Sequence, residues 1–238
     1  MENFKKLREL NLKETKNKLR ESVTEDVLII QAIAHVEDLN KVINILAKDL
    51  REWYCYYNPE FSRNTQEHND FVDAIIKKED KKPKDSLGAD LSEEDLKPII
   101  ILSKKISELF GLKDNQEKYI EEMMNKFFPN ISAIATPLIG AKLIKHAGSL
   151  KRMIFMPSST IQLLGAEEAL FRHIKTGAKC PKYGVLHSHP LVAKAKRKDA
   201  GRAARMLASK ISIASKVDYA KGKFIGDKLL KEVEEKLK

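Results

Sequence analysis

The sequence predicts an all-helical protein made of a long antiparallel coiled-coil arm and a globular helical domain. Two long stretches, 24–57 and 92–128, repeat apolar side chains at alternating steps of three and four residues, as in a coiled-coil seam. Residues 131–238 hold 22 Lys and Arg against 8 Asp and Glu, whereas the first 130 residues hold 22 against 26. We therefore divide the chain into an N-terminal segment (1–23), a coiled-coil domain (24–130) and a basic domain (131–238).

The first long helix is predicted over 24–57. Thr24 is the expected N-cap, and the helix should end at Asn58 because proline, here Pro59, disfavours helical geometry in the residue before it. A second apolar row beside the seam predicts contact with more than one partner helix. The seam is Ile29, Ala32, Val36, Leu39, Ile43, Leu46, Leu50, Trp53 and Tyr57, and the second row is Ile30, Ile33, Val42 and Ile45.

The second long helix is predicted over 92–128, antiparallel to the first. Ser92 and Asp95 form a pattern close to a capping box at its start. Between the long helices we expect a short helix over 67–78 and a polar loop over 81–88. The seam of the second helix is Ile99, Leu102, Ile106, Leu109, Ile120, Met123 and Phe127, interrupted by the polar Lys113 and Gln116.

The basic domain is predicted to contain helices over 137–146, 166–175, 196–217 and 227–237. Gly148 and Gly177 are the expected C-caps of the first two. In helix 166–175, we expect one side to face the core and the other to face solvent. The core side is Ala169, Leu170 and Ile174, and the solvent side is Arg172 and Lys175.

Helix 196–217 carries the clearest signal for nucleic acid. One face repeats polar and basic residues at helical spacing, and the opposite face is apolar. Arginine suits bidentate contact with phosphate, and further lysines precede the helix, so the pattern favours an RNA backbone; a merely solvated face is the alternative. The polar face is Lys198, Arg202, Arg205 and Ser209, and the apolar face is Ala204, Leu207, Ile211 and Ala214.

Several classes of protein are disfavoured by what the sequence lacks. It has no apolar stretch long enough to cross a bilayer and no signal peptide, so we expect a soluble intracellular protein without a membrane partner. The two cysteines, Cys55 and Cys180, form no disulfide framework or zinc motif. Because no glycine-rich cofactor loop and no nucleophile–base pair stands out, we expect no enzyme activity, no cofactor and no bound metal.

Four segments of the basic domain together resemble the NOP domain, the RNA–protein recognition module of box C/D small ribonucleoproteins. They are the block from Gly165 to His173, the block from Thr176 to Lys179, His187-Ser188-His189-Pro190, and the basic helix from Lys196 to Val217. Glu168 replaces a common lysine of the family, which removes a phosphate partner there. His187 stands for an aromatic residue and Ser188 for a glutamine, whose reach is longer.

The coiled-coil domain resembles the coiled-coil insertion of archaeal Nop proteins. The matching segments are 11–16, 51–54, 90–96 and 128–131. The resemblance implies self-association through this arm. The N-terminal domain through which the family binds fibrillarin, the methyltransferase, is not expected here, because only about twenty residues precede the first long helix. The residues predicted to pair two chains are Leu39, Ile43, Leu46 and Leu50.

The resemblance implies a scaffold that binds kink-turn guide RNA together with a ribosomal-type kink-turn-binding protein. Such a scaffold supports fibrillarin-dependent 2′-O-methylation of RNA, in the cytoplasm of an archaeon or the nucleolus of a eukaryote. The residues predicted to contact RNA and the partner protein are Gly165, Ala166, Glu167, Glu168, Arg172, Lys175, Lys179, Lys182, His187, Ser188, His189, Lys196, Arg197, Lys198, Arg202 and Arg205.

Three alternatives remain open from sequence. A related spliceosomal protein with a NOP domain shares the same motifs. An RNA phosphodiesterase would use His173, His187 and His189, although no Cys or carboxylate ligand lies near them at metal spacing. A coiled-coil assembly protein with an incidental basic end is the third.

Overall fold

The computed structural model describes residues 2–79 and 81–237, and within these ranges it is all-helical without any strand, as predicted. No helix in these ranges is both long enough and apolar enough to cross a membrane. The helices are α1 (Glu2–Ser22), α2 (Glu25–Cys55), α3 (Pro59–Asn64), α4 (His68–Lys77), α5 (Glu93–Phe127), α6 (Pro129–Ala135), α7 (Pro137–Ala147), α8 (Leu150–Phe155), α9 (Ser158–Leu163), α10 (Glu167–Thr176), the 3-10 helix η1 (Val185–Ser188), α11 (Pro190–Ala193), α12 (Ala200–Tyr219) and α13 (Gly226–Leu237).

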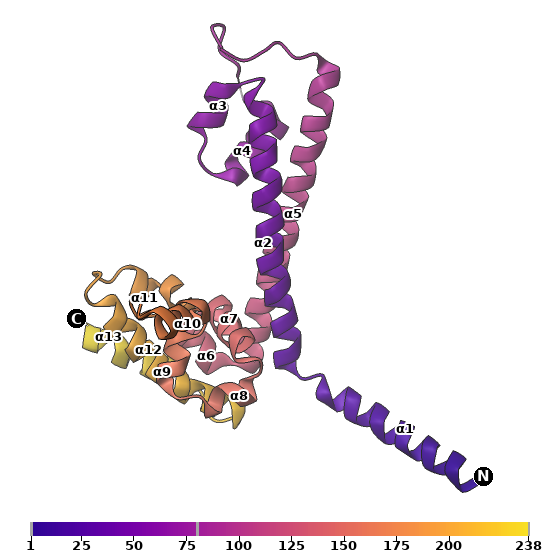
Figure 1. The fold of residues 1–238 in the computed structure, drawn as a ribbon, viewed down its shortest axis with the longest axis vertical. Coiled ribbons are helices and arrows are strands. Elements are labelled where there is room, and N and C mark those ends of the chain that lie inside the picture. Colours follow the sequence, from indigo (N-terminus) through magenta and orange to yellow (C-terminus); the bar gives the residue numbers. More distant parts are fainter. Residues whose placement is uncertain (1, 80, 238) are drawn as a thin grey trace. The chain divides into compact units, whose positions relative to one another are not determined.

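The chain forms two compact units. The arm unit is Ala34–Lys118, and the globular unit combines the residues up to Ile33 with those from Tyr119 onward. The boundaries between the units fall inside α2 and α5, so these two helices contribute to both (Figure 1).

In the arm unit, α2 and α5 run antiparallel side by side, as the seams predicted (Figure 1). Ile43 and Leu50 of α2, Ile99 and Ile106 of α5, and Phe71 of α4 belong to one buried cluster. Burial of each such side chain stabilises the unit by roughly 1.5–3 kcal/mol. The short helix α4 lies where the sequence placed a helix, and the capping box at the start of α5 forms, with Asp95 N–H donating to Ser92 Oγ at 3.2 Å.

The seam of α2 shifts by one residue in its second half. Trp53, predicted to be buried, is 42 % exposed, whereas Tyr54 is 2 % exposed. Beyond Ile43 the buried positions are Ala47, Leu50 and Tyr54. A straight helix of 3.6 residues per turn drifts relative to a 3.5-residue repeat, and this drift moves the buried line off the predicted one.

The second apolar row of α2 is only partly covered. Ile33 is fully buried, but Val42 is 45 % exposed and Ile45 is 61 % exposed. Val42 and Ile45 are thus not covered within the described chain, and the predicted contact with a further partner helix is not made there by the chain itself.

The N-terminal segment forms a helix that was not predicted, and Thr24 makes a different hydrogen bond from the predicted one. The segment before the arm forms the helix α1, whose described side chains from Phe4 onward are exposed. Thr24 precedes α2 as predicted, but its hydroxyl donates to the Asp26 carboxylate instead of accepting from a backbone N–H. The same carboxylate accepts from Leu150 N–H at 2.9 Å and so ties α2 to α8.

The globular unit is built around α12. Its predicted apolar face, Ala204, Leu207, Ile211 and Ala214, is fully buried. At the end of α12, the Asp218 carboxylate accepts from the backbone N–H groups of Asn130 and Ile131 at 3.2 and 2.9 Å and so caps α6. Burial raises the pKa of Asp218, and these hydrogen bonds oppose that rise. The α12 helix thus holds the surrounding short helices in place.

Candidate nucleic-acid interface

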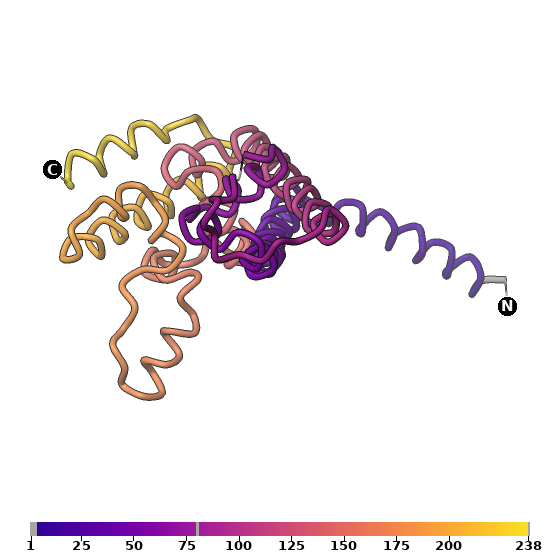
Figure 2. The backbone as a smooth tube through the Cα atoms, turned by 90° about the horizontal axis from the view of Figure 1, so that it is seen from above, coloured from indigo at the N-terminus to yellow at the C-terminus, as the bar shows by residue number. Residues whose placement is uncertain are grey.

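A hairpin of residues 165–184, which contains α10, projects from the rest of the globular unit (Figure 2). Two backbone hydrogen bonds close its base: Gly184 N–H donates to Gln162 O at 3.0 Å, and Val185 N–H donates to Leu164 O at 2.8 Å. The Gln162 side chain adds a third, donating through Nε2 to Lys182 O at 2.6 Å. The hairpin is therefore a closed structural element and not a loose loop.

Two glycines make this closure possible. Gly165 has φ of +85°, and a Cβ there would lie 2.5 Å from Val185 Cγ2. At Gly184, a Cβ would lie 1.9 Å from Leu164 O. Glycine lacks a Cβ and tolerates positive φ, so both positions favour it strongly.

A recess lies at the hairpin base, lined by residues from α7, α10 and η1. Glu167 faces inward: its Oε1 accepts from Gly165 N–H at 2.7 Å and lies 3.5 Å from His146 Nδ1. Tyr183 and His187 pack ring against ring, with centroids 5.3 Å apart. Arg172 also lines this hairpin recess. The recess therefore offers three kinds of contact. These are the guanidinium of Arg172, the aromatic rings of Tyr183 and His187, and hydrogen bonds from their hydroxyl and imidazole groups.

The helix α10 is exposed on both of its sides. Phe171 is 62 % exposed and Ile174 is 69 % exposed, so the prediction that Ile174 faces the core is wrong. Ala169 is exposed as well, and Leu170 is half-buried. The α10 helix has an apolar side, but the hairpin holds this side away from the apolar core of the described chain. The predicted C-cap is confirmed, because Gly177 adopts the left-handed conformation and donates to His173 O.

The basic residues of the hairpin are all exposed: Arg172, Lys175, Lys179 and Lys182. The stem of Lys182 passes Gly201 of α12, whose Cβ, if present, would lie 3.4 Å from Lys182 Cδ. Lys182 therefore lies beside the start of α12. Glu168, the departure from the family's lysine, is exposed and lines the hairpin recess.

The helix α12 begins four residues later than predicted. Lys196, Arg197 and Lys198 lie in the turn before it, where Asp199 N–H donates to Lys196 O at 2.8 Å. The positive end of a helix dipole disfavours neighbouring cations, which accounts for the late start. All three cations are exposed, but Lys198 does not share a helical face with Arg202.

Arg202 and Arg205 point outward from α12, as predicted. Arg205 is exposed, with no hydrogen bond or ion pair from its side chain among the described residues. Arg202 is also exposed, but its Nη2 donates to Lys236 O at 3.1 Å, at the end of α13. Arg202 therefore supports the C-terminal helix as well as adding positive charge.

The three histidines that an RNA phosphodiesterase would use each contact different neighbours. His189 is 4 % exposed, and its Nδ1 accepts from Leu191 N–H at 3.2 Å, which caps α11. Burial lowers the pKa of His189, opposed by a hydrogen bond with the backbone of Ile134. His173 Nδ1 contacts Ala178 O, and His187 packs on Tyr183. Within residues 2–79 and 81–237, no group of three or more His, Cys, Asp or Glu could hold a metal ion.

The remaining predicted contacts of the family motif lie at the hairpin base. Ala166 is half-buried and occupies the N-cap position of α10, and Ser188 is exposed at the end of η1. His146 and Tyr183 also line the hairpin recess but were not predicted. No local pattern marks His146, because only the folded chain brings α7 beside the hairpin.

The four residues predicted to pair two chains are largely covered by the chain itself. Leu39, Ile43 and Leu50 are 7 %, 2 % and 0 % exposed, and Leu46 is half-buried against the arm cluster. Val42 and Ile45, on the same helix, carry the exposed apolar surface.

Comparison with known families decides which family the chain belongs to. The Nop family, described as "snoRNA binding domain, fibrillarin", matches residues 35–238. The chain belongs to the Nop family. This match confirms the resemblance seen in the hairpin and in the arm segments 51–54, 90–96 and 128–131. The family description names snoRNA binding.

Archaeal and eukaryotic relatives share the same region. A NOP5 family protein of Methanocaldococcus jannaschii is 35 % identical over 234 residues, covering 89 % of this chain and 56 % of the relative. Nucleolar protein 58 of Schizosaccharomyces pombe is 36 % identical over 215 residues, covering 81 % and 42 %. Nucleolar protein 56 of the same yeast is 34 % identical over 242 residues, covering 89 % and 49 %. The chain spans about half the length of these relatives.

A solved structure shares the fold. A chain in the crystal structure of a fibrillarin/Nop5p complex aligns with a TM-score of 0.60 and 26 % identity. The alignment covers 98 % of this chain and 77 % of that chain.

Proposed function

We propose that this chain is a scaffold of box C/D ribonucleoproteins that binds kink-turn guide RNA together with a kink-turn-binding protein. The observation that carries the proposal is the 165–184 hairpin, which combines exposed cations with exposed apolar side chains on one projecting element. Phosphates are recognised by the cations, whereas Phe171 and Ile174 require an apolar partner. A composite surface of RNA and protein satisfies both.

The RNA-facing set in this proposal is smaller than the predicted one. It retains the exposed cations of the hairpin and of the turn before α12, together with Arg202, Arg205, His187 and Ser188. Glu167 acts by holding the hairpin base, and buried His189 acts by capping α11. These two residues shape the interface without touching RNA.

The wider assembly is also part of the proposal. The family description and the fibrillarin/Nop5p structure support fibrillarin as a partner. By the family resemblance, 2′-O-methylation of RNA would be the activity of the assembled particle. We propose that two chains pair through the exposed side of α2 at Val42 and Ile45. The particle would reside in the cytoplasm of an archaeon or the nucleolus of a eukaryote.

An electrophoretic mobility assay tests the proposal. The probe is box C/D RNA saturated with its kink-turn-binding protein, and the control is an RNA of equal length whose kink-turn is replaced by a regular duplex. We expect the chain to retard the kink-turn complex further and to leave the duplex control largely unbound at the same salt concentration. Equal retardation of both RNAs would contradict the proposal.

A further inference from the structure

The end of the arm unit carries a second recess, separate from the hairpin. This tip recess has a volume of about 500 Å³ and lies between α2, the end of α4 and the start of α5. Ligand pockets commonly have volumes of this order. Its floor is aromatic and aliphatic, with Tyr54, Tyr57 and Ile75 among the lining residues.

The Tyr54 hydroxyl is an unsatisfied donor at this recess. Tyr54 is 2 % exposed, and its hydroxyl has no hydrogen-bond partner among the described residues. Three other aromatic rings, of Tyr57, Phe61 and Phe71, pack around the Tyr54 ring with centroids 5.6–6.1 Å away and fix its position. Buried polar groups are almost always hydrogen-bonded, so an orphan hydroxyl beside a recess points to a ligand acceptor.

Lysines surround the opening. Lys78, Lys81 and Lys97 line the recess and are exposed, and their side chains form no ion pair among the described residues. Lys82 also lines it but is held by Ala89 O and Asp90 Oδ1, both at 2.9 Å. Glu93 is the one acidic lining residue, so the recess is strongly electropositive.

Lys78 occupies a backbone position that favours glycine. It has φ of +58° directly after α4, where its N–H donates to Ile75 O and Glu79 N–H donates to Ala74 O. This geometry is a Schellman motif, which most often has glycine at the left-handed residue. Lys78 adopts this strained conformation and lines the recess, which is a second sign of function.

We propose that the tip recess binds one nucleotide of a single-stranded RNA, with the phosphate near Lys78 and Lys97 and the Tyr54 hydroxyl donating to the ligand. A nucleotide combines a flat, weakly polar base with an anionic phosphate, and it matches an apolar floor under a cationic rim. The carboxylates of an acidic peptide sit on short, narrow aliphatic side chains, which would not fill the recess. This site does not depend on the hairpin interface.

Photo-cross-linking of the full chain to a short oligouridine that contains 4-thiouridine tests the proposal. Cross-links mapped by mass spectrometry report the tip recess and the hairpin separately, so failure of one site does not obscure the other. We expect cross-links to peptides that contain Tyr57 or Leu96. Their absence, while the hairpin cross-links form, would overturn the proposal.

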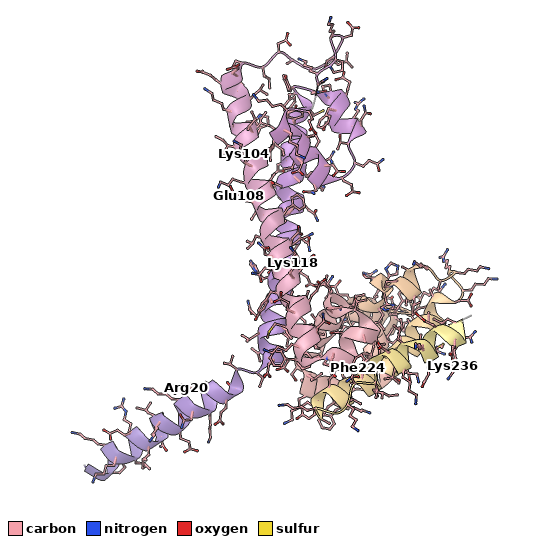
Figure 3. The ribbon with its side chains drawn as sticks, turned by 180° about the vertical axis from the view of Figure 1, so that it is seen from behind. Arg20, Lys104, Glu108, Lys118, Phe224 and Lys236 are labelled. Carbon is pink, nitrogen blue, oxygen red and sulfur yellow. The ribbon has the colours of Figure 1, made fainter. Side chains whose placement is uncertain are left out.

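Two variants and a matched control sharpen the test. Lys78→Gly should weaken cross-linking at the tip roughly threefold to tenfold and raise the melting temperature, because glycine relieves the left-handed strain. Tyr54→Phe should weaken cross-linking at the tip roughly tenfold without lowering the melting temperature. Lys104→Ala removes an exposed lysine from α5 outside the recess (Figure 3) and should change neither quantity. Unchanged cross-linking in both variants, or equal competition by oligoglutamate, would overturn the assignment to RNA.

Discussion

Gly165 controls the geometry of the hairpin through its backbone. Gly165→Ala would force a side chain into φ of +85° and bring its Cβ 2.5 Å from Val185 Cγ2. We expect a loss of stability of about 2–4 kcal/mol, from the left-handed conformation and the steric overlap together. Chemical denaturation measures this loss.

Gly177→Ala is the matched control for this variant. Gly177 has φ of +68°, but no atom would lie within 4 Å of its Cβ. It should lose only about 1–2 kcal/mol, from the conformation alone. Equal losses in the two variants would show that the Val185 contact does not matter.

Arg205 and Arg202 separate electrostatic from structural roles on one helix. Arg205→Ala should reduce the slope of log binding constant against log salt concentration by about one unit and leave the melting temperature unchanged. Arg202→Ala should do the same and also destabilise the protein by about 1 kcal/mol, because the hydrogen bond to Lys236 O is lost. Binding measured over a salt series and thermal unfolding provide the two readouts. If Arg205→Ala retains the wild-type salt dependence, this face of α12 is only solvated.

At the scale of elements, sequence periodicity predicted the long helices well. The buried face of α12, the capping box of α5 and the left-handed caps at Gly148 and Gly177 all form as predicted. Each depends on residues close together in sequence, whose spacing carries the information.

Features that depend on distant contacts were not predictable in the same way. Around Tyr54, the rings of Phe61 in α3 and Phe71 in α4 complete the core, and these contacts come from outside α2. The exposure of α10 depends on the closure of the hairpin between Gln162 and Gly184. An amphipathic pattern shows that a helix has an apolar side, but it does not show whether the partner belongs to the same chain.

Phe171 of α10 is predicted to contact the kink-turn-binding protein. Phe171→Ser should leave the fold intact, because this side chain is already 62 % exposed. Loss of an apolar contact with the kink-turn-binding protein should weaken the ternary complex roughly tenfold or more, since burying a Phe contributes about 1.5–3 kcal/mol. Phe155→Ser, at a 78 % exposed phenylalanine of α8, is the control and should have no effect. Titration of the chain into the RNA–protein complex compares the two, and equal weakening would exclude a specific role for α10.

The α2 helix offers neighbouring positions with opposite expectations. Ile45→Asp replaces a 61 % exposed side chain and should convert a dimer to a monomer while the melting temperature is retained. Leu46→Asp places a charge against the arm cluster and should lower the melting temperature, because an unpaired buried charge is destabilising by several kcal/mol. Light scattering gives the mass and calorimetry gives the stability. A monomeric wild-type chain would refute self-association through this surface.

At the scale of the whole molecule, each unit presents candidate binding surfaces of its own. The globular unit presents the cations of the hairpin and α12, and the arm unit presents exposed apolar residues on α2 and the electropositive tip recess. Such a distribution suits a scaffold, which holds several partners at once through separate surfaces. It follows that the binding of one partner should affect the binding of another wherever they share a surface.

The coupling between RNA and the kink-turn-binding protein is the property that a composite binding surface requires. The measurement is the affinity of the full chain for kink-turn RNA, with and without saturating partner protein, at one fixed salt concentration. A hairpin that reads a composite surface predicts that the partner raises this affinity at least roughly tenfold, or about 1.4 kcal/mol. Equal affinity with and without the partner would contradict the account.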